Sequence, residues 1–342
     1  MDTLTAEKKR IGVIGAGSWG TALANLLGEQ DLVDLWVFEE DLFHTMARER
    51  ENKIFLPGVR LLEKIHLTCS LEEAFTGKDI LVCALPSHVV REIFSRAQPY
   101  IQDNVLIVSA TKGLENKSYQ TASQVLREII GGSRKVEIAS LSGPSFAREV
   151  SRKLPTAVAV AGINPEAAGR AQDLFSRAYF RVYTNPDLVG VELGGAIKNV
   201  MAIAAGTADG LGFGHSSRAA LITRGLAEMT RLGVKMGADA RTFSGLAGLG
   251  DLVLTCTGDL SRNRSLGLEL GKGRPLAAIL GEMRTVAEGV RTTKALRELA
   301  KRQQVEMPIT EKVHEILYEE KAPREAVAEL MSRQPRSERE GF

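Results

Sequence analysis

Short apolar runs alternate with amphipathic stretches over the first half of the chain. Six runs have the length and composition of β-strands, and several are apolar on both faces, as a parallel sheet covered by helices requires. They are Ile11–Ile14, Val33–Phe38, Ile80–Leu85, Val105–Ala110, Val136–Leu141 and Ala157–Ala161. Helical spacing lies between them, as in Thr21–Leu27 and Ser118–Ile130. This repeated order predicts an α/β fold with a doubly wound sheet.

The strand pattern stops near Pro186, and only helical patterns follow. They cover Asp187–Ala208, Ser217–Met236, Val286–Gln303 and Glu311–Tyr318, and glycine-rich turns join them. We therefore expect a sheet domain over 1–188 and an all-α domain over 189–332. The polar, charged residues 333–342 are expected to form a loose tail.

Charge and composition narrow the class of protein. The chain has 342 residues, of which 44% are hydrophobic and 25% charged, so it can bury a core and is not disordered throughout. Its 44 Lys and Arg against 42 Asp and Glu leave a net charge of +2, which disfavours nucleic-acid binding. An anionic partner must then be bound by a few well-placed cations.

The three cysteines and the first residues indicate a compartment. Cys69, Cys83 and Cys256 are far apart and form no Cys-x-x-Cys or Cys/His cluster, so we expect no disulfide framework and no metal site. The first ten residues lack the apolar core of a signal peptide, and no run of about 18 apolar residues predicts a membrane span. These features favour the cytoplasm.

A glycine-rich loop follows the first predicted strand directly and opens a helix. Its residues are Gly15-Ala16-Gly17-Ser18-Trp19-Gly20, a G-x-G-x-x-G. Gly15 allows the tight turn, Gly17 lets a pyrophosphate approach the backbone, and Gly20 allows close helix–strand packing. A ligand-free turn is the alternative, but the strand–loop–helix context favours a Rossmann-type dinucleotide site.

Two acids, Glu39 and Glu40, follow the second predicted strand. A carboxylate there binds ribose hydroxyls and repels a 2′-phosphate, which favours NAD. Both acids could equally well stabilise the start of the next helix. No arginine stands at this strand end to bind the phosphate of NADP, and the choice between NAD and NADP stays open.

Lys198 is the sharpest candidate for chemistry, because its helix is apolar nearly all round. A buried amine has a lowered pKa that suits proton transfer, although a lysine at a helix edge could instead extend to solvent. Gly194 and Gly195 lie on the same helical face and would leave the amine open to a ligand. Asp251, in another apolar, glycine-rich stretch, is the obvious partner of Lys198. His88 and His215 lack a neighbouring acid and rank below Lys198.

Further cations and turns lie where ligands of α/β proteins bind. Lys112 and the segment Leu141–Ala147 each follow a predicted strand, and we expect a helix to start at Pro144. In Ser261-Arg262-Asn263-Arg264 the serine has the place of an N-cap. Cations in a first helical turn fit an anion bound there, although a solvated loop is the alternative.

Together these segments resemble the NAD(P)-dependent glycerol-3-phosphate dehydrogenases of the bacterial type. The matching segments run in order along nearly the whole chain, outside Arg333–Phe342. They are Gly15–Ala22, Leu85–Ser87, Ala110–Glu115, Leu141–Glu149, Glu192–Gly206, Gly248–Thr255, Ser261–Asn263 and Ala287–Gly289.

The resemblance implies a role for each matching residue. Lys198 matches the proton donor and acceptor, and Asp251 is expected to position it. Cofactor contacts are implied at Gly15, Gly17, Ser18, Trp19, Gly20, Phe38, Glu39, Lys112, Ala147, Arg262, Val286 and Glu288. Substrate contacts are implied at Lys112, Gly143, Ser145, Lys198, Asp251, Ser261, Arg262 and Asn263. Phe38-Glu39 departs from the family at a variable position, which leaves the preference for NAD or NADP open.

The implied activity interconverts dihydroxyacetone phosphate and sn-glycerol 3-phosphate with NAD or NADP, for phospholipid synthesis, without a metal. The family also implies a homodimer formed through the helical domain. Two other functions remain: a two-domain dehydrogenase for another 2-keto or 3-hydroxy substrate, and a non-catalytic module that senses nicotinamide cofactors. Loss of a proton donor or phosphate cation would favour the sensing module, but Lys198 and Arg262 are both present.

Overall fold

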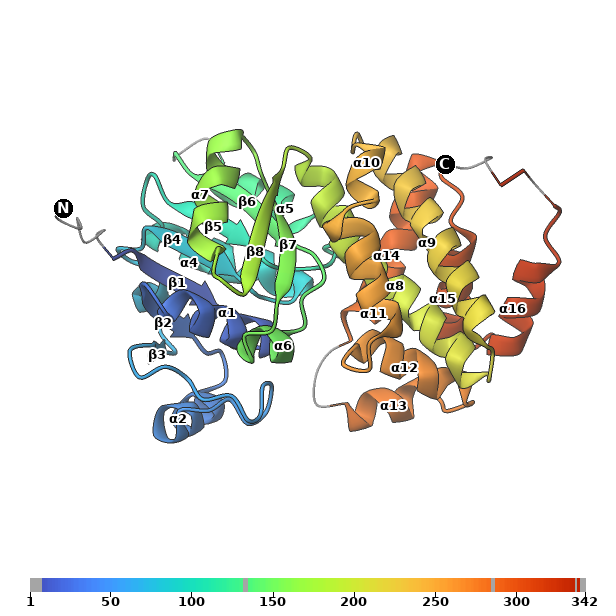
Figure 1. The fold of residues 1–342 in the computed structure, drawn as a ribbon, viewed down its shortest axis with the longest axis horizontal. Coiled ribbons are helices and arrows are strands. Elements are labelled where there is room, and N and C mark those ends of the chain that lie inside the picture. The colour runs from blue at the N-terminus through green and yellow to red at the C-terminus, as the bar shows by residue number, and fades with distance from the viewer. Residues whose placement is uncertain (1–7, 132–134, 284–286, 336, 339–342) are drawn as a thin grey trace.

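An eight-stranded sheet forms the core of the first part of the molecule (Figure 1). The computed structural model describes residues 8–131, 135–283, 287–335 and 337–338. The strand order is β3-β2-β1-β4-β5-β6-β7-β8, and every pair is parallel except β6 with β7. The strands are β1 (Arg10–Ile14), β2 (Leu32–Trp36), β3 (His66–Thr68), β4 (Ile80–Cys83), β5 (Leu106–Ser109), β6 (Glu137–Ser142), β7 (Thr156–Gly162) and β8 (Phe180–Asn185).

Helices cover both faces of this sheet, and apolar cores lie under them. They are α1 (Ser18–Gly28), α2 (Glu40–Glu49), α3 (Leu71–Phe75), α4 (Val90–Ala97), α5 (Ala122–Ile130), α6 (Ala147–Ser151) and α7 (Pro165–Phe175). The predicted doubly wound α/β fold, followed by helices alone, is confirmed.

Two strands and one helix start differ from the sequence-based expectation. Neither β3 nor β8 is among the six predicted strands. β3 has only three residues, and β8 alternates between buried and exposed positions, as expected of a half-covered strand. The helix expected from Ser118 begins at Ala122, because Thr121 and Gln124 form a capping box there. The prediction of a parallel sheet is wrong for β7, which runs antiparallel to β6. A strand buried on both faces shows the same apolar pattern in either direction, so the sequence does not reveal this.

The second part of the chain is a bundle built around α8 (Leu188–Gly210). By length and composition α8 could cross a membrane, but 83% of its most apolar window is buried inside the protein, as in the core helix of a bundle. The proposed domain division after residue 188 falls at its first residue. The other helices are α9 (His215–Lys235), α10 (Ala240–Phe243), α11 (Asp251–Thr257), α12 (Arg262–Gly271), α13 (Leu276–Glu282), α14 (Glu288–Gln303), α15 (Pro308–Tyr318) and α16 (Pro323–Met331).

Three predicted features lie near the ends of these helices. The helix expected from Val286 begins at Glu288 in the described chain, and Val286 itself lies outside the described residues. α15 begins at Pro308, three residues before the predicted start, because proline suits the first turn of a helix. Within the expected loose tail, Arg333 pairs with Glu306 at 3.2 Å.

Glycines let α8 and α12 approach until their backbones touch. A Cβ added at Gly206 would lie 2.0 Å from the Arg264 carbonyl oxygen, and one at Gly267 would lie 2.1 Å from that of Ile203. Any side chain at these positions would force the helices apart. This contact places the first turn of α12 beside the middle of α8, which carries Lys198.

Replacement of Gly206 by alanine is expected to destabilise the bundle by about 1–3 kcal/mol, because the clash is with backbone atoms. Chemical unfolding followed by circular dichroism measures this. Gly281→Ala in α13 is the matched control: no atom lies within 4 Å of its added Cβ, so the better helix former should add roughly 0.5–1 kcal/mol. Equal stability of the two variants would contradict the proposed close packing.

Candidate active site

The three glycines of the loop after β1 meet three different constraints. Gly15 has φ +112°, a conformation that side chains disfavour, and Gly20 packs so closely that its Cβ would lie 1.8 Å from the Gly15 carbonyl oxygen. At Gly17 no atom lies within 4 Å of an added Cβ, so its outer side is open. Turn, open approach and close packing thus fall on the three positions that the sequence predicts.

The helix that this loop opens can receive an anion. α1 begins at Ser18 with Gly17 as its N-cap, and no side chain in the described part of the protein caps it, so N–H groups of the first turn remain available. The indole N–H of Trp19 is buried without a hydrogen-bond partner in the structure. These residues fit the pyrophosphate of a dinucleotide, whose oxygens would accept hydrogen bonds from the N–H groups of this turn.

Two lysines from distant parts of the chain share one buried carboxylate. Asp251, at the start of α11, is fully buried and accepts a hydrogen bond from Lys198 Nζ at 2.5 Å and another from Lys112 Nζ at 2.7 Å. Lys198 comes from α8, whereas Lys112 follows β5 at the edge of the sheet where the strands end. The structure therefore joins the two parts of the molecule at the lysines and the acid that the sequence singled out.

Burial sets the protonation of Lys198. Only 7% of the residue is exposed, and the loss of hydration lowers the pKa of its amine to about 8. The Asp251 carboxylate acts against this shift, and the Lys112 ammonium adds to it. An amine with this pKa exchanges protons readily near neutral pH, as a general acid or base must.

Thr255, which the sequence analysis did not identify, contacts both Lys198 and Asp251. Its hydroxyl accepts a hydrogen bond from Lys198 Nζ at 2.9 Å and donates one to the Asp251 carbonyl oxygen at 2.6 Å. Thr255 lies four residues after Asp251, one turn along α11. That spacing was the available signal, and it became informative only once Lys198 was placed against α11.

Gly194 and Gly195 have a different role from the expected one. A Cβ at Gly194 would lie 2.4 Å from the Ala247 carbonyl oxygen, and one at Gly195 would lie 2.6 Å from Ser142 Oγ. These glycines let α8 pack against the π-helical turn Leu246–Gly250 and against β6, instead of leaving space for a ligand. The expectation of ligand access on this face was wrong, because the Ala247 backbone and the Ser142 side chain fill the space beside these glycines.

The first turn of α12 lies beside Lys198. Ser261 caps the helix, its hydroxyl accepting from the Arg264 N–H at 3.2 Å, as predicted. Asn263 donates from its amide to Asn199 Oδ1 at 2.9 Å and accepts the Gly289 N–H at 2.9 Å. Asn199, next to Lys198 on α8, was also missed by the sequence reading. These bonds fix the start of α12 against α8 and α14.

Arg262 and Glu288 face the same space. The Arg262 side chain retains solvent contact, yet desolvation by neighbouring protein atoms lowers the pKa of its guanidinium, and the Glu288 carboxylate opposes that shift. Burial raises the pKa of Glu288, whose carboxylate accepts a hydrogen bond from Ser87 Oγ at 3.2 Å. Arg262 stays protonated in water, so it offers a permanent cation in this space.

The turn after β6 supplies the remaining expected contacts on the sheet side. Gly143 has φ +143°, and its carbonyl oxygen accepts hydrogen bonds from Lys112 Nζ at 3.0 Å and from Ser145 Oγ at 3.1 Å. The helix expected from Pro144 begins at Ala147 instead, because Phe146 is still extended and forms its N-cap. Gly143 and Ser145 therefore lie beside Lys112, and Ala147 opens α6.

The end of β2 keeps the cofactor choice open. Phe38 is 65% exposed, and its ring centroid lies 5.8 Å from that of Trp36. Glu39 occupies the N-cap position of α2 without a capping hydrogen bond, whereas Glu40 lies in the first helical turn. Glu40 is thus placed to interact with the helix dipole, and the exposed Glu39 carboxylate is not engaged as a cap.

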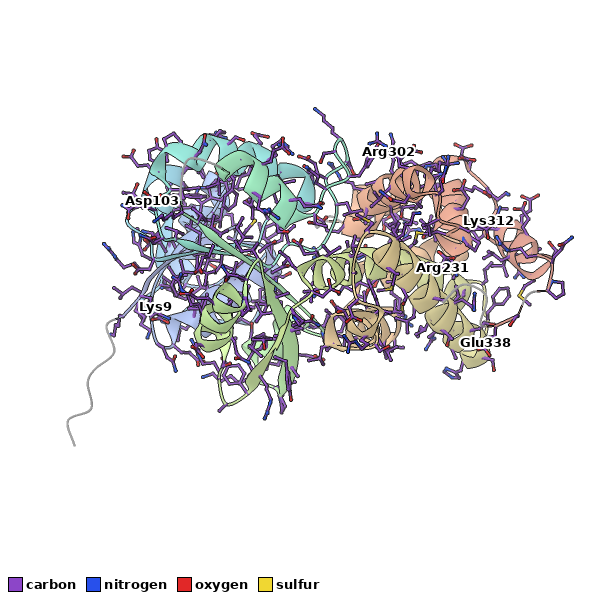
Figure 2. All side chains as sticks on the ribbon, turned by 90° about the horizontal axis from the view of Figure 1, so that it is seen from above. Lys9, Asp103, Arg231, Arg302, Lys312 and Glu338 are labelled. Carbon is purple, nitrogen blue, oxygen red and sulfur yellow. The ribbon has the colours of Figure 1, made fainter. Side chains whose placement is uncertain are left out.

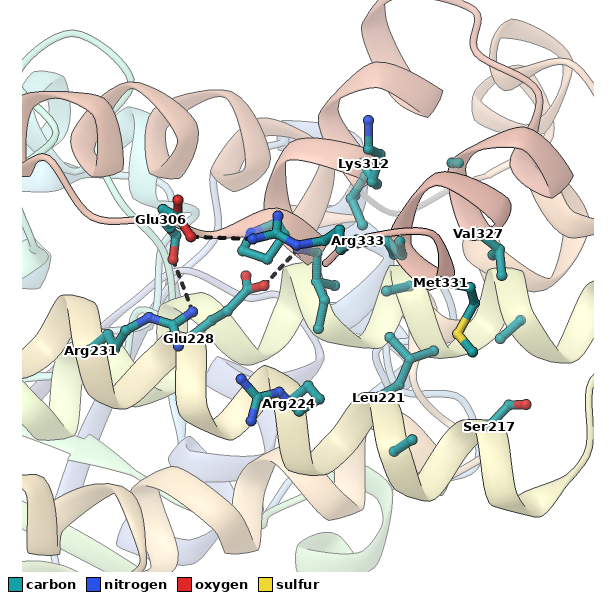
Figure 3. A pocket seen from close by; sticks show the side chains of 18 of the residues that line it. Ser217, Leu221, Arg224, Glu228, Arg231, Glu306, Lys312, Val327, Met331 and Arg333 are labelled. Carbon is teal, nitrogen blue, oxygen red and sulfur yellow. Dashed lines mark hydrogen bonds and ion pairs between the residues drawn. The ribbon is translucent and has the colours of Figure 1, made fainter. Parts of the chain in front are cut away.

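A large cavity lies elsewhere, on the outer side of the bundle between α9, α15 and α16 (Figure 3). Its volume is about 1550 Å³, and Leu221 and Met331 line it from opposite sides. Lys198, Asp251, Lys112 and Arg262 do not belong to its lining. Charged residues of both signs lie on both parts of the molecule, such as Lys9 and Asp103 on the sheet part and Lys312 and Glu338 on the helical part (Figure 2).

Comparison with known proteins places this site in a family. Residues 10–168 match the model of the NAD-dependent glycerol-3-phosphate dehydrogenase N-terminus, and residues 187–328 match that of the C-terminus. The chain belongs to the NAD-dependent glycerol-3-phosphate dehydrogenase family. It is 56% identical to the glycerol-3-phosphate dehydrogenase (NAD(P)+) of Geobacter metallireducens over 97% of this chain and 99% of that protein.

Solved structures of this family share the architecture. The glycerol-3-phosphate dehydrogenase of Coxiella burnetii is 41% identical and superposes with a TM-score of 0.92, over 95% of this chain and 99% of that one. The yeast enzyme from Saccharomyces cerevisiae is 26% identical, with a TM-score of 0.80 over 96% and 100% of the two chains. The resemblance inferred from the sequence motifs is therefore confirmed.

Proposed function

We propose that this glycerol-3-phosphate dehydrogenase homologue interconverts dihydroxyacetone phosphate and sn-glycerol 3-phosphate, with Lys198 as proton donor and acceptor. The observation that carries the proposal is the buried group of Lys198, Lys112 and Asp251 where the two parts of the chain meet. The names of close relatives support the reaction and the use of NAD or NADP.

The reaction needs a hydride and a proton at adjacent atoms of the substrate. A dinucleotide held by the glycine loop and the start of α1 would supply the hydride to C2 of the ketone, or accept it from C2 of the alcohol. As negative charge develops on the C2 oxygen, the Lys198 ammonium stabilises it by a hydrogen bond and then donates its proton. In the reverse direction neutral Lys198 takes the proton from the C2 hydroxyl.

Neighbouring groups prepare Lys198 for this step. Asp251 and Thr255 fix the direction of its Nζ, so that one remaining N–H can point to substrate. Two ammonium groups around one carboxylate leave a net positive charge, which favours an anionic substrate in a poorly hydrated site. We propose that Lys112, Gly143 and Ser145 contact the substrate from the sheet side.

The phosphate of the substrate needs a second anchor away from the reacting carbon. We propose that Arg262 and the first turn of α12 bind it, with Ser261 and Asn263 shaping that turn. Binding energy gained at the phosphate then helps to hold the C2 carbonyl in the orientation that the reaction needs. The same guanidinium, with Glu288, also borders the proposed cofactor site.

Several finer expectations accompany this function as proposals. We propose that the enzyme supplies glycerol 3-phosphate for phospholipid synthesis in the cytoplasm and acts as a homodimer. The choice between NAD and NADP rests on Phe38, Glu39 and Glu40, and parallel initial-rate measurements with NADH and NADPH would decide it.

Lys198→Met is expected to lower kcat for dihydroxyacetone phosphate by about 10²–10⁴, because the side chain proposed to protonate the ketone is lost. Binding of NADH, followed by its fluorescence, should change less than about twofold, since Lys198 is assigned to the substrate. Lys301→Met, at an exposed lysine of α14, is the control and should retain full activity. Retained turnover in Lys198→Met would overturn the assignment.

The pH dependence of the two directions should be opposite. Reduction needs protonated Lys198, so its rate should fall as pH rises through about 8, the pKa of the buried amine. Oxidation needs neutral Lys198, so its rate should rise through the same range. In Asp251→Asn both midpoints should move to lower pH, because the carboxylate that stabilises the ammonium is gone. Midpoints that stay unchanged would contradict the pairing.

Arg262→Met is expected to raise KM for dihydroxyacetone phosphate by about 10- to 100-fold at saturating NADH, the usual effect of losing a charge-assisted hydrogen bond. Activity on dihydroxyacetone, which has no phosphate, should change less than about threefold and serves as the matched control. A wild-type enzyme that prefers a ketone without phosphate would instead support the alternative of a dehydrogenase for another substrate.

A further inference from the structure

A buried asparagine reaches the glycine loop from a distant part of the chain. Asn52 lies after α2, in the connection that leads to β3, and it is completely inaccessible to solvent. Its Nδ2 donates to the Ala16 carbonyl oxygen at 2.7 Å and to Thr21 Oγ1 at 2.9 Å. Its Oδ1 accepts the Phe55 N–H at 3.0 Å. Each polar atom of this side chain is therefore engaged, and the carbonyl acceptor fixes which atom is the nitrogen.

The bond to Ala16 acts on the peptide that joins Ala16 to Gly17. This peptide is trans, so its carbonyl oxygen and the Gly17 N–H point in opposite directions. When Asn52 holds the oxygen on the inner side of the loop, the N–H must turn to the outer side. Gly17 is also the glycine whose added Cβ would meet no atom within 4 Å.

Thr21 supports the same arrangement from α1. Its hydroxyl lies 3.4 Å from the Ala16 oxygen, to which it donates, and it accepts one of the Asn52 hydrogens. Both Thr21 and Asn52 are fully buried, so water does not compete for these bonds. A flipped Ala16–Gly17 peptide would remove the acceptor of the Thr21 hydroxyl and of one N–H of the Asn52 amide in the interior, which is costly.

We propose that Asn52 is a positioning residue for the cofactor: it fixes the Ala16–Gly17 peptide in the orientation that presents its N–H to the pyrophosphate. The inference rests on the proposed use of a dinucleotide at this loop. Asn52 itself is buried beneath the loop and acts through the backbone, so it affects affinity without taking part in the reaction.

A purely structural role would be to tether the connection between α2 and β3. A second asparagine allows this role to be separated from the proposed one. Asn25, on α1, donates to the Arg60 carbonyl oxygen at 3.0 Å and accepts the Leu62 N–H at 3.1 Å, so it tethers the same connection. No hydrogen bond joins the Asn25 side chain to the glycine loop in the described part of the chain. Asn25→Ala is therefore the matched control for Asn52→Ala.

The experiment measures dissociation constants of NADH and of ADP-ribose, which carries the pyrophosphate without the nicotinamide, for the purified full-length variants. Asn52→Ala should weaken both ligands by about 5- to 50-fold, the effect of one or two buried hydrogen bonds. Asn25→Ala should weaken them less than about twofold. With saturating NADH, kcat for dihydroxyacetone phosphate should be close to that of the wild type in both variants.

Thermal unfolding monitors the fold of each variant. Should Asn52→Ala fail to fold, Thr21→Val replaces it, because it removes the hydroxyl shared by Ala16 and Asn52 with little change of volume; both ligands should again weaken, by about 2- to 10-fold. Unchanged affinity in a folded Asn52→Ala or Thr21→Val, or an equal loss in Asn25→Ala, would overturn the positioning role. A wild-type protein that binds neither ligand would instead overturn the proposed function.

Discussion

The buried carboxylate of Asp251 is the group on which the candidate active site depends. It accepts hydrogen bonds from Lys198 of the helical bundle and from Lys112 of the sheet part, so one acid joins two regions that are far apart in sequence. A fully buried carboxylate without cations would be very costly, and so would the buried Lys198 ammonium without an anion. Because two cations share one anion, the group keeps an excess positive charge in a place where water is scarce. That excess is what an anionic ketone can use.

Close backbone packing makes this arrangement possible. Gly194 and Gly195 let α8 press against both the turn before α11 and the end of β6, which brings Lys198 within reach of Asp251. Gly206 does the same between α8 and α12 and so brings the cation Arg262 beside the site. At these places glycine allows two elements to pack closely, whereas Gly15 allows a backbone conformation that side chains disfavour.

The sequence was sufficient for the fold class, the glycine loop and the pairing of Lys198 with Asp251. Each of these leaves a local signal: an apolar run, a spacing of glycines, or a charge in an apolar helix that needs a partner. It was not sufficient for β8, whose pattern is half polar, or for the direction of β7. The role of Gly194 was misread, because which neighbour fills the space beside a glycine is a property of tertiary packing alone.

Asn52 and Thr255 show the same limit within the site. Asn52 lies in a connection without helical or strand periodicity, and nothing near it in sequence marks its contact with Ala16, 36 residues away. In sequence, nothing distinguishes Thr255 from the other residues of its apolar helix. Its role is visible only once Lys198 is seen to contact it. Groups that act through a neighbour in space are therefore the part of the site that local sequence patterns reveal least.

Burial lowers the pKa of Lys198 and Asp251 opposes this shift, so the two together set the protonation of the amine. The most direct measurement is an NMR titration of the Lys198 side-chain amine in the full-length protein, assigned by comparison with Lys198→Met and repeated in Asp251→Asn. We expect a pKa of about 8 for this amine in the wild type and a lower value in Asp251→Asn. A wild-type pKa near 10.5, the ordinary value of lysine, would contradict it.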